Sequence, residues 1–400
     1  MRLSTVQIFQ QGVNAILDRQ FELNQTQQQI ASGKRVSSPA DDPIAAVQIL
    51  DISEDLNKID QYARNTTTAE SQLALSDSTL GRVGDVLQRV RELAVQGNNA
   101  TQDAASRRAL GAEVQQRLDE LLALANTRDA NGEYLYAGFQ STQQPFTRQG
   151  GVIGYEGDDG QRFLEVAENT RVAVRDSGSA IFLDIPAGNG RFAIAADGGN
   201  TGTAVVGEAS ADGSYLPDDY TISFSQPLPG DPVSYTVTDG SAATVASGTY
   251  SSGDVITFNG ASVVFEGQPA DADSFSIGAS PRRDLFTTVA AIADALLQAE
   301  DGPAGSARVN NELGSGLRNL DQGLEAILGK RAELGARLNR VETQQSVNED
   351  FALQLQETLS DVQDLDYAEA ISRLNLQLVA LQAAQQTFVR VQGLSLFNFL

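Results

Sequence analysis

Residues 32–47 read SGKRVSSPADDPIAAV, and this stretch decides how the N-terminal region folds. A Gly-Lys pair followed by serines and aspartates occurs in phosphate-binding loops, where backbone amides hold the phosphates. Such a loop has the pattern G-x-x-x-x-G-K-[ST] and comes after a strand. Here Gln28 replaces the first glycine, Arg35 follows the lysine, and the preceding residues have helical spacing. The stretch therefore does not indicate a nucleotide site.

The same residues fit a turn between two helices. Gly33 can adopt the left-handed backbone conformation that commonly ends a helix. Asp41 or Asp42 can cap the helix that follows, and Pro43 suits its first turn because no amide hydrogen is needed there. A helical hairpin explains these residues without a metal or a phosphate.

The composition excludes most kinds of catalytic site. The 400 residues contain no cysteine and no histidine, and their formal net charge is -24. Disulfides, thiolate metal sites, cysteine nucleophiles and histidine bases are therefore unavailable. We expect no enzymatic activity, no catalytic residues, no cofactor and no metal site. A nucleic-acid partner is also disfavoured, because the excess negative charge would repel it.

Targeting signals are absent from the sequence. The first residues, MRLSTVQIFQQGVNAILDRQ, lack the apolar core of a cleaved signal peptide. No stretch of about 18 apolar residues marks a membrane span, so we expect no membrane insertion. These signals alone indicate a soluble cytoplasmic protein, unless export uses a route without signal cleavage.

The first third of the chain has apolar residues at helical spacing. The pattern predicts helices over 4–31, 43–97 and 102–129, with a break in the second near Gly81. Two apolar series carry the prediction: Ala45, Ile49, Ile52, Leu56 and Ile59, then Leu80, Val83, Leu87, Val90 and Ala94.

The middle of the chain has a different pattern. Residues 139–280 hold 20 of the 36 glycines, and short alternating runs such as DYTISFS and VSYTVT lie between turn clusters. This is typical of an antiparallel β domain. The region contains 18 acidic residues against 5 arginines, which favours a solvent-facing surface that does not aggregate. A break near 188–190 would divide it into two β units.

Helical spacing returns at about residue 284 and continues to the end of the chain. Sustained heptads predict a coiled coil, and a helix over about 306–362 would be on the order of 85 Å long at about 1.5 Å per residue. Arg331 interrupts the heptads, which we interpret as a register-setting break. The series are Leu313, Leu320, Ile327, Leu334 and Val341; Leu317, Leu324 and Leu338; Leu355, Leu359 and Val362; and Tyr367, Leu374, Leu381 and Phe388.

The fold class that follows is α+β. Long N- and C-terminal helices pair as an elongated coiled-coil rod, which carries an inserted antiparallel β domain of one or two β units. The predicted divisions are an N-terminal assembly and export segment, 1–40; two halves of the helical rod, 41–138 and 284–365; the β insertion, 139–283; and a C-terminal assembly helix, 366–400.

Several motifs then occur in the order found in one known family. The hairpin SGKRVSSPADDPIAAV, the run RVRELAVQGNNAT at 89–101, NGEYLYAGF at 131–139 and FVRVQGLSLFNFL at 388–400 resemble the flagellin superfamily of bacterial flagellar axial proteins. The resemblance covers about residues 1–147 and 284–400. NGEYLYAGF, followed by Pro145 and Phe146, is similar to the hook-associated members. We expect its tyrosines to pack where the rod meets the β domain.

The resemblance implies a structural role in the flagellum. It implies export by a chaperone and the flagellar type III apparatus without signal cleavage, and hence an extracellular location. It further implies self-association into a ring at the hook-filament junction, on the junction protein FlgK, with a platform presented to flagellin. A flagellin with an atypical outer domain is the alternative.

The candidate assembly interface consists of apolar residues near both ends of the chain. The two terminal helices have apolar series with no obvious third partner inside the chain, and we expect both ends to order only on assembly. The last residues could instead dock on the chain's own rod. The candidate residues are Phe9, Ile16, Leu23, Ile30, Ile371, Leu374, Leu378, Leu381, Phe388, Leu396, Phe397, Phe399 and Leu400.

Two other interpretations concern the acidic loops. An enzyme would need paired carboxylates, but neighbours such as Asp158 and Asp159 point to opposite faces of a strand, so they are typical of turns. A calcium site in the GDDG loop at 157–160 is a second alternative, because oxygen ligands alone would suffice.

Overall fold

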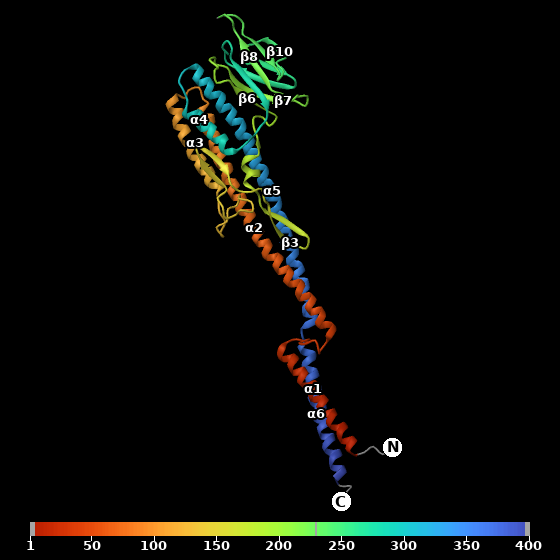
Figure 1. Cartoon of the computed structure of the whole chain (residues 1–400). Helices are drawn as coiled ribbons and strands as arrows, with labels where there is room; N and C mark the ends of the chain where they lie inside the picture. Colours follow the sequence, from red (N-terminus) through yellow and green to blue (C-terminus); the bar gives the residue numbers. More distant parts are fainter. Residues whose placement is uncertain (1–4, 229, 397–400) are drawn as a thin grey trace. The chain divides into compact units, whose positions relative to one another are not determined.

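The computed structural model describes residues 5–228 and 230–396. The chain forms two compact units. We call residues 1–65 and 343–400 the end unit, and residues 66–342 the central unit. Helices α2 (Pro43–Gly97) and α5 (Pro303–Gln363) contribute residues to both units (Figure 1).

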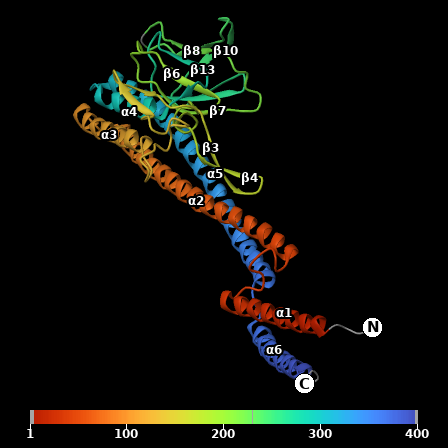
Figure 2. The same ribbon diagram turned by 60° about the horizontal axis from the view of Figure 1, so that its bottom comes forward.

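In the end unit, α1 (Thr5–Ser32) packs along α6 (Tyr367–Leu396) (Figure 1, Figure 2). Leu23 of α1 is buried, and the rings of Phe9 and Phe388 lie 5.1 Å apart. These contacts follow from the seven-residue spacing, which puts apolar side chains on one face of each helix.

The stretch at 32–47 forms the predicted hairpin. α1 ends at Ser32, and Gly33 follows with φ +73°, in the left-handed region that favours glycine. One carboxylate oxygen of Asp42 accepts hydrogen bonds from the amides of Ile44 and Ala45, each at 3.1 Å, and so caps α2. Asp41 accepts from the amides of the preceding turn instead.

This connection also pairs with the connection between α5 and α6. The Arg35 amide donates to the Gln363 carbonyl at 2.7 Å, and the Leu365 amide donates to the Gly33 carbonyl at 3.0 Å. The Arg35 guanidinium donates to the Val362 carbonyl at 2.6 Å. The Gly-Lys-Arg sequence therefore joins two helical connections rather than enclosing a phosphate.

The central unit contains the predicted coiled-coil core. All five residues of the first heptad series in α5, from Leu313 to Val341, are buried. They share one core with α2, α3 (Ala104–Ala125) and α4 (Leu285–Leu297). The second series, Leu317, Leu324 and Leu338, packs partly buried against that core.

The first part of the β insertion belongs to the same core. It contains the hairpins β1 (Phe146–Gln149) with β2 (Val152–Tyr155) and β3 (Arg162–Ala167) with β4 (Thr170–Arg175). A π-helical turn, Ser179–Leu183, follows, and β5 (Ile185–Pro186) then pairs with β14 (Arg282–Arg283). The Phe146 ring lies 5.1 Å from Phe286 of α4 and 5.4 Å from Phe182, so this part is held by the helices.

The second part has a core of its own. Two antiparallel sheets, with strand orders β10-β9-β8-β13-β6 and β11-β12-β7, share one set of buried residues. We call this part the β sandwich. Its strands are β6 (Phe192–Ala196), β7 (Val205–Ala211), β8 (Tyr220–Ser225), β9 (Ser234–Thr238), β10 (Thr244–Thr249), β11 (Val255–Phe258), β12 (Ala261–Glu266) and β13 (Ser274–Ala279).

Strand β8 shows why the sandwich folds as sheets. Its sequence YTISFS alternates buried and exposed along its whole length, as expected when one face of a strand is covered. Two asparagines of α5, Asn311 and Asn319, accept hydrogen bonds from the sandwich and from the segment that leads into it. Asn311 accepts from the Val206 amide at 2.8 Å, and Asn319 accepts from the Gly188 amide at 2.6 Å.

One expectation about the helices is wrong, and two expectations about divisions of the chain agree with the structure. α2 runs unbroken past Gly81, which is tolerated because a glycine inside a helix costs only about 1 kcal/mol. The helix expected over about 306–362 is observed as α5, and α4 and α6 form separate helices before and after it. The expected break near 188–190 is confirmed, because Ile185 before it belongs to the core shared with the helices and Phe192 after it belongs to the core of the sandwich.

Candidate functional site

Some of the predicted interface residues on α1 and α6 are partly buried within the single chain. Ile16 and Ile30 of α1 and Leu374, Leu381 and Phe388 of α6 are all half-buried in the single chain. Ile371 and Leu378 remain 49% and 37% exposed. Much of the heptad series therefore stabilises the α1–α6 pair itself, and less of it is free to bind another molecule.

A second set of large apolar side chains stays exposed on the same two helices. Phe21 is 71% exposed and Leu376 is 69% exposed. We call this set the terminal apolar surface; its members are Phe9, Leu17 and Phe21 on α1 and Tyr367, Ile371, Leu376, Leu378, Val379 and Val389 on α6. Further exposed apolar residues of the end unit lie on α2 and α5: Ile44, Val47, Leu50, Val347, Phe351 and Leu353.

The exposure of these side chains makes this set a candidate for contacts between protein chains. Each Leu, Val, Ile or Phe side chain contributes roughly 1.5 to 3 kcal/mol when it is fully buried. Exposed apolar residues in such numbers on paired helices are typical of protein–protein contacts.

Sequence reasoning missed Leu17, Phe21, Leu376 and Val379 as interface candidates. The signal was present, because Leu17 and Phe21 are four residues apart and Leu376 and Val379 are three apart. Both spacings put the pair on one face of a helix.

The last predicted residues cannot be placed. Phe397, Phe399 and Leu400 lie outside the described residues, and Leu396 is the last residue of α6. The prediction that both chain ends order only on assembly therefore stays a prediction.

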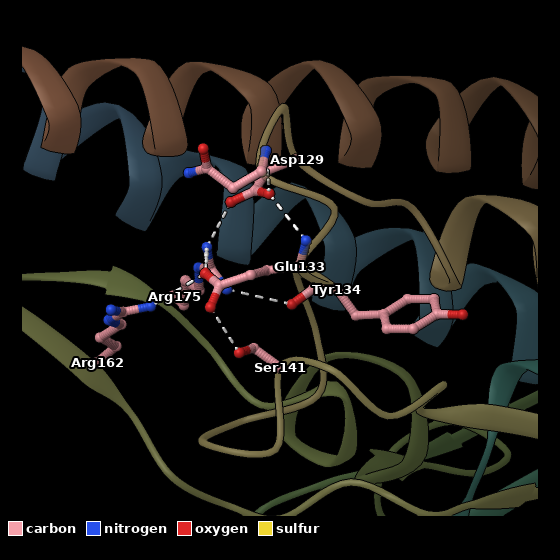
Figure 3. Close-up of polar contacts among 7 residues, drawn as sticks. Asp129, Glu133, Tyr134, Ser141, Arg162 and Arg175 are labelled. Atoms are coloured by element: carbon pink, nitrogen blue, oxygen red, sulfur yellow. Dashed lines mark hydrogen bonds and ion pairs between the residues drawn. The ribbon is translucent and has the colours of Figure 1, made fainter.

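The motif NGEYLYAGF forms a joint between the helices and the first β hairpins, centred on a buried arginine. Arg175 of β4 is 2% exposed. Its guanidinium donates to Asp129 Oδ2 at 2.6 Å and to Glu133 Oε2 at 2.7 Å (Figure 3). Because Asp129 follows α3 and Arg175 ends β4, these ion pairs fix the hairpins to the helical core.

Two further groups contact the Glu133 carboxylate. Its carboxylate accepts from the Ser141 hydroxyl at 2.9 Å and pairs with Arg162 at 3.1 Å (Figure 3). The Ser141 hydrogen bond and the nearby charges of Arg175 and Arg162 lower the pKa of Glu133, against an opposing effect of burial. The Arg128 guanidinium stacks on the neighbouring Tyr134 ring, 4.2 Å from its centre. Tyr134 and Tyr136 are buried at this joint, as predicted.

The end of the motif NGEYLYAGF contacts the acidic GDDG loop at 157–160. Gly138 has φ +68°, and a side chain there would collide with Asp158. The Asp158 carboxylate accepts from the amides of Phe139 at 2.9 Å, Gln140 at 3.1 Å and Gly160 at 2.7 Å. These hydrogen bonds lower the pKa of Asp158. The loop therefore uses the Asp158 carboxylate to hold a turn.

The described residues show neither a metal-ion cluster nor a membrane-spanning helix. They contain no cluster of three or more Asp, Glu, His or Cys side chains placed to hold a metal ion. None of their helices is long and apolar enough to cross a membrane.

Comparison with known protein families identifies the class of protein to which this chain belongs. The model of the bacterial flagellin N-terminal helical region matches residues 3–141, and that of the C-terminal helical region matches residues 317–400. These matches cover the helices at both ends of the chain. The chain is therefore a flagellin-type structural protein of the bacterial flagellum.

Within that class it belongs to the FlgL, or hook-associated protein 3, family. Flagellar hook-associated protein 3 of Escherichia coli is 27% identical over 100% of this chain and 99% of its own length. FlgL of Xanthomonas campestris is 33% identical with a TM-score of 0.72, covering 77% of this chain and 99% of that one. The flagellar junction protein FlgL of Legionella pneumophila is likewise 33% identical with a TM-score of 0.72, covering 79% and 100%.

The same comparison decides between the two flagellar alternatives. A flagellar filament core protein matches only 34% of this chain, and a phase 1 flagellin matches 30%. Hook-associated protein 3 matches the whole length instead. The relation to flagellin itself is thus more distant, and the prediction of a hook-associated protein is confirmed.

Proposed function

We propose that copies of this chain assemble into a ring at the junction between hook and filament. One side of the ring contacts a FlgK-type junction protein, and the other presents a platform on which flagellin assembles. The protein reaches this place outside the cell through the flagellar type III apparatus, with an export chaperone and without signal cleavage. A Legionella relative that covers most of the chain is described as a flagellar junction protein.

The observation that carries the proposal is the terminal apolar surface. α1 and α6 already cover one another's heptad residues, yet Phe21 and Leu376 remain largely exposed. A monomer would gain nothing from leaving such groups in water, whereas burial between copies would contribute roughly 1.5 to 3 kcal/mol for each. The contact also includes Ile371 and Leu378, which the sequence predicted as interface residues and which are partly exposed.

A deletion strain tests the junction role directly. Electron microscopy should show intact hooks without filaments, and the culture medium should contain unpolymerised flagellin. Filaments of normal length on those hooks would contradict the junction role.

Point variants test the surface. Phe21→Asp and Leu376→Asp put a charge where we expect contact between chains, and should abolish filament growth in complementation. Gln20→Asp and Asn375→Asp are matched controls, since both residues are exposed on the same helices beside the targets. The controls should restore filaments. Equal behaviour of targets and controls would show that the surface does not carry the assembly, provided that secreted amounts are equal.

A further inference from the structure

A cavity of about 460 Å³ lies in the central unit between the β sandwich and helices α4 and α5. Its walls are formed by β6 and the loop that follows it, by the outer face of α4 and by the first turns of α5. Ligand sites commonly have volumes of roughly 300 to 1,000 Å³ and lie between substructures. The proposed role in flagellar assembly does not involve this cavity.

The cavity contains an arginine without a partner. Arg318 of α5 lines it and is half-buried. Among the residues that the structure describes, Arg318 forms no ion pair and no hydrogen bond. Burial alone lowers the pKa of its guanidinium, with no nearby carboxylate to oppose the effect. A half-buried cation of this kind is costly unless an anion joins it.

Two of the other charged residues at the cavity are already engaged. Arg308 is ion-paired with Glu300, and Asp197 accepts a hydrogen bond from the Gly199 amide at 2.8 Å. The charges that remain are Arg318, Arg283, Glu312 and Asp294. None of these four has an ion pair within the described part of the chain.

Within the described part of the chain, four charged side chains of the cavity have neither an ion pair nor a side-chain hydrogen bond, two of them positive and two negative, and Asp197 adds a third negative charge. Burial raises the pKa of Glu312, and the more distant Arg308 only partly opposes this. A ligand of one sign would satisfy one pair of residues and be repelled by the other. A ligand with both signs suits all four, because a guanidinium binds a carboxylate through two parallel hydrogen bonds and a carboxylate accepts from an ammonium group.

We propose that this cavity binds a small zwitterion, of the size of an amino acid or a dipeptide. Arg318 holds its carboxylate, and Glu312 holds its amino group. The two residues are six positions apart on α5, or about 9 Å along the helix axis, so a ligand with separated charges fits better than a compact one. Since the walls come from both substructures, the bound molecule would join the sandwich to the helices.

Calorimetric titration of the full-length protein tests the proposal. The probes are glycine, diglycine and 6-aminohexanoate, with acetate and methylammonium as single-charge references. We expect saturable binding of one copy of diglycine or 6-aminohexanoate, about tenfold or more tighter than either reference. No saturable binding up to the solubility limit of the zwitterions overturns the proposal. Equal binding of acetate overturns it too, because the site would then be selective only for anions.

Variants connect the binding to the named residues. Arg318→Gln should weaken zwitterion binding about tenfold or more, and Arg318→Lys, which keeps the charge, should weaken it less. Glu312→Gln should weaken zwitterion binding without affecting acetate. Arg340→Gln is the matched control, an exposed arginine of the same helix, and should bind as the unaltered protein does. Unchanged binding by Arg318→Gln refutes the assignment. Circular dichroism of each variant confirms that it folds.

Discussion

Replacing Arg175 with methionine tests whether the joint at NGEYLYAGF stabilises the central unit. The guanidinium is buried and lies 2.6 Å from Asp129 and 2.7 Å from Glu133. The methionine keeps much of the apolar volume but leaves both carboxylates without this partner. Removing one member of a buried ion pair costs about 3–5 kcal/mol. The Glu133 side chain is 29% exposed and keeps Ser141 and Arg162, so we expect the lower end, about 3 kcal/mol.

Urea unfolding of the full-length protein measures this loss. Far-ultraviolet circular dichroism follows the helices, and tyrosine fluorescence follows the tertiary structure, because the chain has 9 tyrosines and no tryptophan. Arg171→Met is the control: Arg171 is an exposed residue of the same strand, and its replacement should change the free energy of unfolding by about 0.5 kcal/mol or less.

The comparison of the two variants decides the outcome. If Arg175→Met lowers the free energy of unfolding no more than Arg171→Met does, the ion pairs at the joint do not stabilise the fold. A more stable Arg175→Met would show that desolvation of the buried arginine outweighs its attraction to the two carboxylates. Either result would refute the reasoning above.

Three further changes have predicted outcomes. The pKa of Glu133 is lowered in the folded state from 4.5, so its contribution to stability is present above that pH and lost as the pH falls through the folded pKa; Glu133→Gln should flatten the acid dependence of urea unfolding below about pH 4.5. Leu320→Ala should cost about 2–5 kcal/mol and Leu328→Ala under about 0.5, because only the first is buried; equal melting-temperature shifts would contradict this. Gly138→Ala should destabilise more than Gly132→Ala in thermal melts, since both have positive φ but only at Gly138 does the added carbon collide; equal losses would show that the collision is relieved.

The hairpin at 32–47 was predictable because its signals are local. Gly33 ends α1 through its own backbone conformation, and Asp42 caps α2 through amides two and three residues away. Heptad positions such as Leu320 were predictable for a related reason. Their spacing puts them on one helix face, and a face that is apolar for many turns must be covered.

The joint was predictable only in outline. Its tyrosines were expected to pack there, but nothing in the motif indicated Arg175, which lies 42 residues after Glu133 in the sequence. Arg331 shows the same limit. Its expected role in setting the register stays a prediction, and nothing in the sequence indicated its ion pair with Asp77 of α2, at 2.9 Å. Ion pairs between distant segments have no periodic pattern in the sequence, because they depend on which segments pack together in the folded chain.

The sequence by itself determined the helices at both ends, the alternating strands between them, the glycine and aspartate caps, and the family to which the chain belongs. These features depend on neighbours within a few residues, or on motifs read in order. The tertiary structure decided which apolar residues remain free. Phe21 and Leu376 are as apolar as Leu23, but the pairing of α1 with α6 covers Leu23 and leaves the other two in water. Exposure depends on which surfaces meet, and spacing alone does not specify the partner of a helix face.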